Sequence, residues 1–514
     1  MMFPFRRISK VSLVLARKLL MTTPKPLPTL NEDRQSELVN NLSHWALGNG
    51  LTMYPTNFEL HNTGYAPVTL FPTPFPRKQF EKALAVQEDF NELYAQVVKN
   101  QEWLGPILED LSQFDKDFTG KLWETYKEAK TIGIVQPVSL GLFRSDYMVD
   151  TLSASSFDGV NGKIKQIEFN TVSVSFGGLS PKVAQLHRYL NENGNYHNEG
   201  KLHFEDDELP NSESTASLAN GLAKAAAYYN STESTDSSVV LVVVQDNERN
   251  VFDQRALEFD LLKRHKVRSI RLRMEDISAS TDIDEKTKRV RLRATGEEVS
   301  VIYYRSAYAP SDFSNLQNWQ TRLDLEVTKA IKCPSVLTQL SGCKKVQQIL
   351  STKEAIQQFL PTKNDQELST LCDTFVKLYP LDNSELGKRA KKLAFEKPEQ
   401  FVLKPQREGG GNNIYKENIV PFLQSLDEKD WQGYILMELI RPPASKNKII
   451  REGRIYEEDI ISELGVFGTL LFNEDSGKIL SNEVSGWLLR SKFSSSNEGG
   501  VAAGFGCVDS VYLF

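Results

Sequence analysis

The hydrophobic pattern of the first part of the chain has helical periodicity. Residues 33–130 read as helical, with amphipathic runs at Asp33–Leu47 and Phe80–Val98. Further along, residues Gln166–Phe176 alternate between polar and apolar positions and are rich in β-branched side chains, which predicts a strand or a hairpin arm. Polar surface connections are expected at residues 204–219 and 229–238, on the two sides of a short helical segment at residues 218–229.

The pattern changes at Val239, where the continuous run VVLVVVQ predicts a strand that is covered on both faces. Helices and strands then follow each other closely. We expect a helix at Asp253–His265, strands at Val267–Leu272 and Val299–Tyr304, and a helix at Trp319–Lys332. This order predicts a compact α/β subdomain of about 100 residues.

The last third of the chain reads first as helical and then as strand-rich. Helices are expected from Leu340 to about Glu399, with breaks at Pro361 and Pro380. The strands expected after them are Gln400–Pro405, Gly433–Ile440, Asp459–Asn473 and Lys478–Leu489.

Composition and charge exclude several classes of protein. The chain has 514 residues, with 61 basic and 67 acidic side chains and a net charge of −6, and a general nucleic-acid scaffold would usually be strongly basic. The four cysteines are scattered and form no CxxC pair, so neither a disulfide framework nor a zinc knuckle is expected. No apolar run reaches the roughly 18–20 residues of a membrane span. A soluble multi-domain enzyme is the class that remains.

The N-terminal segment has a character of its own. Residues 1–20 carry five bases and no acid, since the first acid is Glu32, and at helical spacing the bases share one arc: Arg6, Arg7, Lys10, Arg17 and Lys18. A basic amphipathic helix of this kind is typical of a mitochondrial presequence, and a disordered basic tail is the alternative. We therefore expect a cytoplasmic enzyme with an additional mitochondrial form directed by residues 1–20, and Met21 offers a second start site.

The segment from Lys404 to Tyr415, KPQREGGGNNIY, predicts a phosphate-binding loop. A strand ends in Lys404, and three consecutive glycines let backbone N–H groups approach an anion. Arg407 adds positive charge, and Glu408 supplies an oxygen ligand that suits Mg²⁺. The alternative is a flexible hairpin loop with solvated charges. The sequence lacks GxxxxGK[ST], so the loop is not of the Walker type.

Glu168 and Asn170 form a second candidate site. On a strand, residues two apart point to the same face, and two oxygen-bearing side chains on one face suit Mg²⁺. Ser173 and Ser175 follow and could bind a polar substrate. The alternative is the solvent-facing side of a half-buried strand.

Three further segments are weaker indications of a binding site. Arg144-Ser-Asp-Tyr147 offers a guanidinium group for a carboxylate or phosphate. Gln245–Asn250 lies beyond a predicted strand, at the end where open α/β sheets bind ligands. Arg490-Ser-Lys492 precedes a glycine-containing polar loop. For each of them a surface salt bridge is the alternative, and the six histidines show no paired ligand spacing.

Taken together, these motifs resemble eukaryotic glutathione synthetases, from about Leu38 to the C-terminus. The strings that carry the resemblance are RSDYM, IEFNTVSVSFGGL, ERNVFDQR, LSGCKKVQQ, KPQREGGGNN, ILMELI, ISELGVFG and LLRSK…NEGGVAAG, in that order. Several long motifs in the right order make the resemblance specific.

The resemblance implies a mixed α/β protein with the ATP-grasp fold, a helical N-terminal part and an inserted α/β substrate-binding subdomain. The expected divisions are 1–30, an N-terminal extension; 31–237, a helical and ATP-grasp part; 238–343, the insertion; and 344–514, an ATP-grasp part with a glycine-rich lid. It also implies a homodimer that ligates glycine to γ-L-glutamyl-L-cysteine through an acyl phosphate (EC 6.3.2.3), the second step of glutathione biosynthesis. A homoglutathione-type ligase that uses another small amino acid is the alternative, and a non-catalytic binding protein on the same scaffold is a further one.

Site residues follow from the resemblance position by position. The metal ligands, for two Mg²⁺ ions, would be Glu168, Asn170 and Glu408. The residues around ATP would be Glu168, Lys344, Lys404, Gln406, Arg407, Glu408, Gly409, Gly410, Gly411, Asn412, Asn413, Tyr415, Met437, Glu438, Leu439, Ile440, Glu463, Lys492 and Glu498. The residues that bind the dipeptide and glycine would be Arg144, Ser173, Ser175, Glu248, Asn250, Gln254, Arg305, Tyr308, Arg490, Val501 and Ala502. Catalysis would rest on Arg144, Lys344, Lys404 and Arg490, which orient the reactants and neutralise charge. Two of these positions depart from the family pattern: Glu498 stands where animal enzymes carry aspartate, and the segment from Arg305 to Tyr308 differs between its ends.

Overall fold

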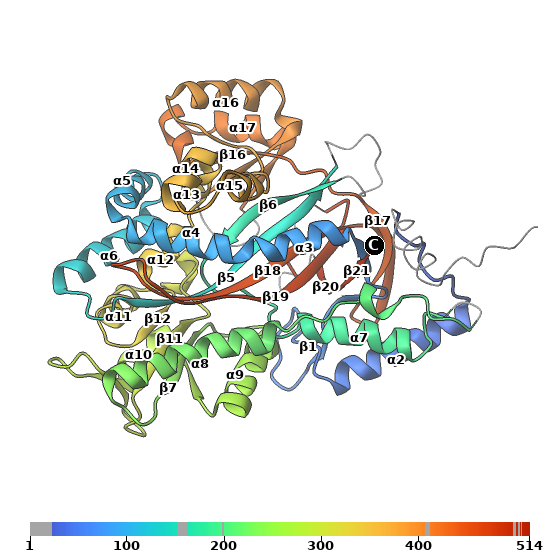
Figure 1. Cartoon of the computed structure of the whole chain (residues 1–514), viewed down its shortest axis with the longest axis horizontal. Coiled ribbons are helices and arrows are strands. Elements are labelled where there is room, and N and C mark those ends of the chain that lie inside the picture. Colours follow the sequence, from blue (N-terminus) through green and yellow to red (C-terminus); the bar gives the residue numbers. More distant parts are fainter. Residues whose placement is uncertain are drawn as a thin grey trace, which may run out of the picture.

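A large mixed sheet forms the centre of the molecule (Figure 1). The structure is a computed structural model of the protein, and it describes residues 23–151, 162–197, 200–406, 412–496, 500–501, 504 and 506–514. Eleven strands make up the sheet, and ten of them follow the order β17, β3, β20, β19, β18, β5, β12, β11, β7, β8, with β6 paired to β5. Their bounds are β3 Val68–Thr69, β5 Val138–Asp150, β6 Lys163–Asn170, β7 Val239–Val244, β8 Arg268–Arg273, β11 Val299–Tyr304, β12 Ile331–Cys333, β17 Ser445–Arg451, β18 Arg454–Asn473, β19 Ile479–Phe493 and β20 Gly506–Asp509.

Strand β5 joins the two halves of this sheet. On one side β5 pairs antiparallel with the long strand β18, and on the other side it pairs parallel with β12. Beyond β12 the strands β11, β7 and β8 continue in parallel. The strands of the predicted insertion thus continue the same sheet as β5, and the boundaries proposed for this domain stay a prediction.

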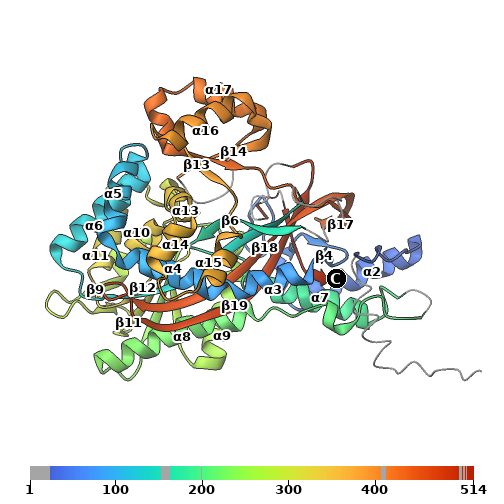
Figure 2. The same cartoon turned by 45° about the horizontal axis from the view of Figure 1, so that its top comes forward.

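Helices cover both faces of the large sheet (Figures 1 and 2). α3 Arg77–Ala85 and α4 Gln87–Lys99 lie on one face, and α8 Ser214–Glu233 and α9 Val251–His265 lie on the other. Strand β7 shows the consequence: Val239, Leu241 and Val243 enter one hydrophobic core, and Val240 and Val242 enter the second. The continuous β-branched run at Val239 therefore forms a strand buried on both faces, as predicted.

The remaining helices surround these layers. Those before residue 200 are α2 Glu32–Gly48, α5 Gln101–Leu111, α6 Lys121–Ile132 and α7 Ser180–Glu192. Those after it are α10 Met274–Ser280, α11 Leu316–Glu326, α12 Val336–Ser341, α13 Lys344–Leu350, α14 Lys353–Phe359 and α15 Asp365–Cys372. Short strands pair beside the large sheet: β1 Thr52–Met53 with β2 Gly64–Tyr65, β9 Thr281–Ile283 with β10 Val290–Leu292, and β4 Thr73–Phe75 with β21 Val511–Leu513.

A second, four-stranded sheet stands above the first in Figure 2. It has the order β13, β16, β14, β15, with bounds Leu378–Pro380, Tyr434–Glu438, Phe401–Pro405 and Ile414–Tyr415. α16 Glu385–Glu396 and α17 Ile419–Gln424 cover its outer face. Its other face holds Val402 and Met437 in a small core against which Ile167 of β6 packs. The two sheets therefore meet at β6.

Several predicted elements differ from the observed ones for physical reasons. The strand expected at Gln166–Phe176 ends at Asn170, because Ser173 and Phe176 take positive φ angles of 52° and 70° and leave the sheet ladder. The helix expected at Trp319–Lys332 ends at Glu326, and β12 begins at Ile331 because its apolar side chains are buried in the large sheet.

Other differences concern polar or short segments. Residues 33–130 also contain the short strands β1 to β4, and residues 340–399 contain β13. The helix expected at residues 218–229 extends from Ser214 to Glu233, so parts of both flanking connections are helical. No helix in the part of the chain that the structure describes is both long and apolar enough to cross a membrane.

Candidate active site

Two antiparallel strands of the large sheet bring four polar side chains to one place. The pairing of β5 with β6 sets Arg144 opposite Asn170 and Asp146 opposite Glu168. Residues that are directly opposite share a face, and so do residues two apart on one strand. All four side chains therefore lie on the same face of the sheet.

Asp146 is the centre of this group. Its carboxylate is fully buried and accepts two hydrogen bonds from Arg144, at 2.6 Å from Nε and 2.7 Å from Nη2. Asn170 donates from Nδ2 at 3.0 Å, and Arg490 donates from Nη2 at 3.1 Å. One carboxylate thus binds a side chain from β5, one from β6 and one from β19.

Arg490 joins the group through the β18–β19 hairpin. The register of the hairpin places Arg490 opposite Glu463, and the guanidinium group also contacts the Glu463 carboxylate. Burial raises the pKa of Glu463, Arg490 opposes that rise, and the nearby carboxylates of Asp146 and Glu168 reinforce it. The arginine therefore contacts two acids at once, the fully buried Asp146 and the partly buried Glu463.

Two lysines face the metal-ligand candidate Glu168. Lys344, at the start of α13, donates to Glu168 Oε2 at 2.9 Å, and Lys404, on β14 of the small sheet, donates to the Ile167 carbonyl at 3.3 Å. Burial alone would raise the pKa of Glu168, but the two lysines lower it well below the usual range. Burial, partly offset by Glu168, lowers the pKa of Lys404 to about 8. A buried cation with a lowered pKa favours the arrival of a further anion.

The loop after β6 carries the two predicted serines. Ser173 donates from Oγ to the Arg305 carbonyl at 3.0 Å, and Arg305 donates from Nη2 to Ser175 Oγ at 2.8 Å. Arg144 reaches the same loop through the Ser175 carbonyl, at 3.3 Å. Both arginines are buried, so the loop is held between two fixed guanidinium groups.

Asp253 fixes the second half of this loop. Its two carboxylate oxygens accept hydrogen bonds from the backbone N–H groups of Phe176 and Gly178 at 2.7 Å and of Leu179 at 3.0 Å. Asn250 adds a bond from Nδ2 at 3.2 Å. The positive φ of Phe176 is thereby stabilised by a side chain on α9, more than seventy residues away in sequence.

The polar segment after β7 lies at the carboxyl end of the parallel strands, as predicted. Glu248 accepts from the backbone N–H of Asn250 at 2.7 Å and from Gln254 Nε2 at 3.1 Å. Tyr308 shares hydrogen bonds with Gln245 across the sheet edge. These residues form a second polar group. Arg305 contacts the serine loop and interacts electrostatically with Glu248 of this group.

The predicted nucleotide residues that the structure describes lie mainly on the small sheet. Gln406 accepts the backbone N–H of Lys345 at 2.8 Å, which links the end of β14 to α13. Asn413 donates to the Tyr415 hydroxyl at 3.1 Å. Met437 is buried in the small core beside Val402, whereas Glu438 accepts a hydrogen bond from Tyr379 at 2.8 Å within the small sheet. Leu439 and Ile440 pack beside that core, and Asn412 is exposed.

For some other predicted residues the structure gives only a strand face or a core, and the rest lie outside the described residues. Lys492 follows Arg490 by two positions on β19 and so shares its face, and Val501 is buried in the second core. The residues outside the described ranges are Arg407, Glu408, Gly409, Gly410, Gly411, Glu498 and Ala502, together with residues 1–20.

A small cavity is lined by residues from both predicted binding regions. Its volume is about 20 Å³, and its lining includes Tyr308, Gln339, Cys343 and Gln406. Within the described ranges, Gln339 Oε1 and Gln406 Nε2 are buried without a hydrogen-bond partner. Such atoms favour contact with a polar ligand at this point.

Sequence reasoning missed three polar residues of this region: Asp146, Asp253 and Gln339. The first was visible in principle, because Arg144 and Asp146 are two apart on a strand and so form a same-face pair of opposite charge. The other two act through the fold and have no local signal. Across the described ranges, no cluster of three or more His, Cys, Asp or Glu side chains is placed to hold a metal ion.

Comparison with known proteins places this geometry in a family. The model of the eukaryotic glutathione synthase ATP-binding domain matches residues 32–513. The chain is 41% identical to the glutathione synthetase of Homo sapiens over 94% of this chain and 98% of that one. It is 38% identical to the glutathione synthetase large chain of Schizosaccharomyces pombe, over 87% and 91% of the two chains.

The fold has a solved counterpart. A glutathione synthetase-like effector from Globodera pallida, in its apo form, superposes with a TM-score of 0.74 at 22% identity, over 96% of this chain and all of that one. This likeness confirms the mixed α/β fold. The match over nearly the whole length and the identity to curated relatives agree with the resemblance read from the motifs. The chain therefore belongs to the eukaryotic glutathione synthase family.

Proposed function

We propose that the chain is an ATP-dependent ligase that joins glycine to γ-L-glutamyl-L-cysteine and releases ADP and phosphate, through an acyl phosphate. Family membership supports the activity, because the relatives of Homo sapiens and Dictyostelium discoideum are named glutathione synthetases. One structural observation supports the proposal and indicates which residues perform the reaction. Lys344, Lys404 and Arg490 converge from three elements on the carboxylates of Asp146, Glu168 and Glu463.

The chemistry requires that convergence. A carboxylate that attacks a phosphorus atom brings two negative groups into contact, and fixed cations lower the barrier by neutralising the charge that develops. In our proposal Arg144 and Arg490 orient the cysteinyl carboxylate of the dipeptide. Lys344 and Lys404 hold the phosphates, and the amine of glycine then attacks the activated carbonyl carbon as phosphate leaves.

The serine loop and the polar group after β7 would bind the γ-glutamyl part. Ser173 and Ser175 offer hydroxyl groups from a loop that two buried arginines hold in place. Arg305, Glu248 and Asn250 provide charges of both signs, which match the α-amino and α-carboxylate groups of a γ-glutamyl residue. We propose Gln254, Tyr308, Val501 and Ala502 as the remaining contacts of the dipeptide and glycine.

Magnesium fits the donor set that the structure describes. Glu168 offers a carboxylate, and Asn170 offers an amide oxygen on the same face, both of which are hard oxygen ligands that suit Mg²⁺. We propose that these two residues and Glu408 hold two Mg²⁺ ions. When bound, the ions would screen the charge of the triphosphate and polarise the transferred phosphoryl group.

A product assay tests the proposed function. Phosphate release from ATP should require both γ-glutamylcysteine and glycine, and mass spectrometry should find glutathione. Hydrolysis without glycine, or nucleotide binding without any turnover, would contradict the ligase proposal. The same assay with β-alanine and serine in place of glycine tests the homoglutathione-type alternative.

We also propose the wider properties that the family resemblance implies. They are an ATP-grasp arrangement of the two sheets around the nucleotide, a homodimer, and a cytoplasmic location with a mitochondrial form directed by residues 1–20. Sedimentation equilibrium of the full chain tests the dimer, which predicts twice the 58.2 kDa mass of one chain. Imaging of residues 1–30 fused to a reporter tests the location, and purely diffuse signal would contradict the mitochondrial form.

A further inference from the structure

We infer that Asp146 is a positioning residue for three members of the active site at once: both arginines that face the dipeptide and the amide of Asn170. This inference rests on the proposed function and deepens it. Asp146 itself is fully buried beneath the groups that it holds. Its role is therefore to set where those groups point.

The arginines are fixed in different ways by the same carboxylate. Arg144 donates to both oxygens of Asp146 in a bidentate pair, which fixes the plane of its guanidinium group. Arg490 reaches only Oδ2 and is held on its other side by Glu463. Because the pair is bidentate, replacing Asp146 with asparagine, which has the same shape, would remove the negative charge and one of the two acceptor oxygens.

The amide of Asn170 is oriented by the same network. Its Nδ2 donates to Asp146 Oδ2 at 3.0 Å and to the Arg144 carbonyl at 3.3 Å, and both partners can only accept. An amide whose nitrogen is held by two acceptors has its carbonyl oxygen on the other branch. Asp146 thus selects the amide rotamer in which the oxygen, the atom that a cation needs, points away from the arginine cluster.

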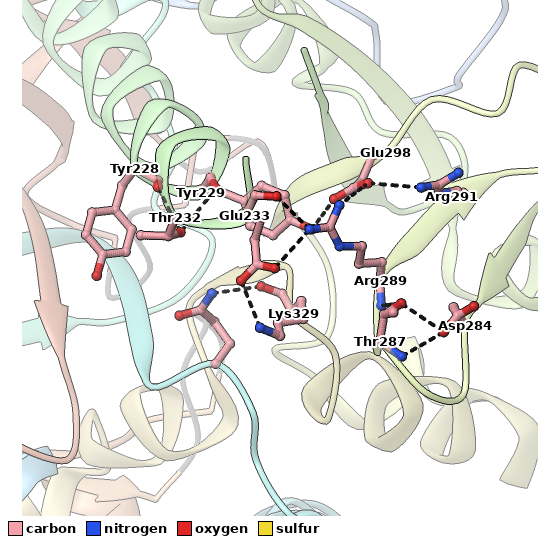
Figure 3. Close-up of polar contacts among 11 residues, drawn as sticks. Tyr228, Tyr229, Thr232, Glu233, Asp284, Thr287, Arg289, Arg291, Glu298 and Lys329 are labelled. Carbon is pink, nitrogen blue, oxygen red and sulfur yellow. Dashed lines mark hydrogen bonds and ion pairs between the residues drawn. The ribbon is translucent and has the colours of Figure 1, made fainter. Parts of the chain in front are cut away.

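A second carboxylate elsewhere in the molecule provides a matched control. Glu298 is also buried, and it also contacts two arginines and one neutral donor: Arg289 at 3.2 Å, Arg291 at 3.5 Å and the Tyr229 hydroxyl at 2.6 Å (Figure 3). None of these residues belongs to the proposed active site. Glu298→Gln therefore reports what the loss of such a buried carboxylate does to the protein by itself.

The experiment compares Asp146→Asn with Glu298→Gln in the full chain. Calorimetry would measure ADP affinity with Mg²⁺ and with EDTA, and steady-state assays would separate kcat from KM for the dipeptide. For Asp146→Asn we expect the gain in ADP affinity from Mg²⁺ to shrink about tenfold and kcat/KM for the dipeptide to fall about 100-fold. ADP affinity in EDTA should stay within about threefold. Glu298→Gln should leave all of these values unchanged.

Two further variants keep the test decisive. Asn170→Ala should lose the Mg²⁺ gain but keep the KM for the dipeptide, since the arginines stay clamped. Asp146→Ser, which leaves room for water around the guanidinium groups, carries the same expectations as Asp146→Asn if that variant does not fold.

The possible failures are distinguishable. A wild-type Mg²⁺ gain and wild-type dipeptide kinetics in the folded Asp146 variants would overturn the positioning role. Equal losses in Glu298→Gln would overturn it too, because they would point to a general effect of removing a buried acid. A wild-type chain that makes no glutathione would instead contradict the proposed function.

Discussion

The molecule contains two networks of charged side chains with similar composition, and they differ in how fully their cations are balanced by acids. In the first, around Asp146, the cations come from β5, β19, α13 and the small sheet, and they meet acids on β5, β6 and β18. In the second, shown in Figure 3, Arg289 contacts Glu298 and Glu233, and Lys329 contacts Glu233 at 2.9 Å. The second network ties the end of α8 to β10, the segment before β11 and the segment before β12.

The pKa directions separate the two networks. Lys404 is buried close to a second lysine, and its pKa is lowered to about 8, while the pKa of Glu463 is raised. Arg289 behaves in the opposite way: burial would lower its pKa, but Glu298, Tyr229 and Glu233 raise it. Charges in the Arg289 network thus stabilise one another. In the Asp146 network Glu168 and Arg490 are also stabilised in their charged forms, but Lys404 is a buried cation that a further anion would stabilise. Ion pairs alone do not mark an active site. A buried charged group with a shifted pKa and an incomplete set of counter-charges is the better indicator.

The strongest test of the difference between the two networks replaces one lysine in each of them. Lys344 pairs with Glu168, and Lys329 pairs with Glu233, each at 2.9 Å. Lys344→Met should lower kcat about 10²- to 10³-fold, because a fixed charge that neutralises the transition state is lost. Because Lys344 is buried and pairs with Glu168, the free energy of unfolding should fall as well, so kcat is compared per folded molecule.

Lys329→Met is the matched control for Lys344→Met. It should keep wild-type kcat, measured as phosphate release in the presence of both substrates. Equal losses of activity in the two variants would remove the distinction between the networks.

Arg289→Leu tests the structural network. It leaves the largely buried carboxylates of Glu298 and Glu233 without their shared cation, and we expect the free energy of unfolding to fall by about 1–3 kcal/mol. Urea titration followed by fluorescence measures that loss. The activity per folded molecule should stay within about twofold of wild type, and a larger drop would show that this network also serves catalysis.

The smallest expected effect is the pH dependence of nucleotide binding. Because the pKa of Lys404 is about 8 in the free protein, the lysine is increasingly neutral above that pH. Phosphate favours the charged form and raises its pKa, so binding near pH 8.5 should take up part of a proton, and ADP affinity should fall between pH 7 and 9.

Calorimetry in buffers of different ionisation enthalpy measures this proton uptake. Lys404→Arg should remove the uptake, because arginine keeps its charge throughout this range. Affinity that is constant from pH 7 to 9 in the wild type would contradict the assignment to Lys404.

Local patterns predicted the elements of the fold better than its connections. The buried strand at Val239 and the helix after it were evident from periodicity, because both depend on neighbouring residues. Strand β5 was not predicted, although it joins the two halves of the sheet, and nothing local distinguishes that position. Likewise the end of β6 at Asn170 depends on Asp253, a partner that lies far away in sequence.

The candidate site shows the same division. The spacing of Glu168 and Asn170 predicted a shared face correctly, because strand geometry fixes it. The resemblance supplied Lys344 and gave a role to Arg490, which was a weak signal by itself, because periodicity could not connect either residue to that face. Asp146 was missed because its importance lies in the three side chains that it holds, and these come together only in the folded chain.

Anomalous diffraction from crystals grown with Mn²⁺ and ADP tests the central claim most directly, because manganese replaces magnesium and its position can be measured. The account predicts a manganese peak within coordination distance of the Glu168 carboxylate and the Asn170 amide oxygen, with the phosphates against Lys344 and Lys404. A peak bound to the nucleotide in another part of the molecule would contradict it.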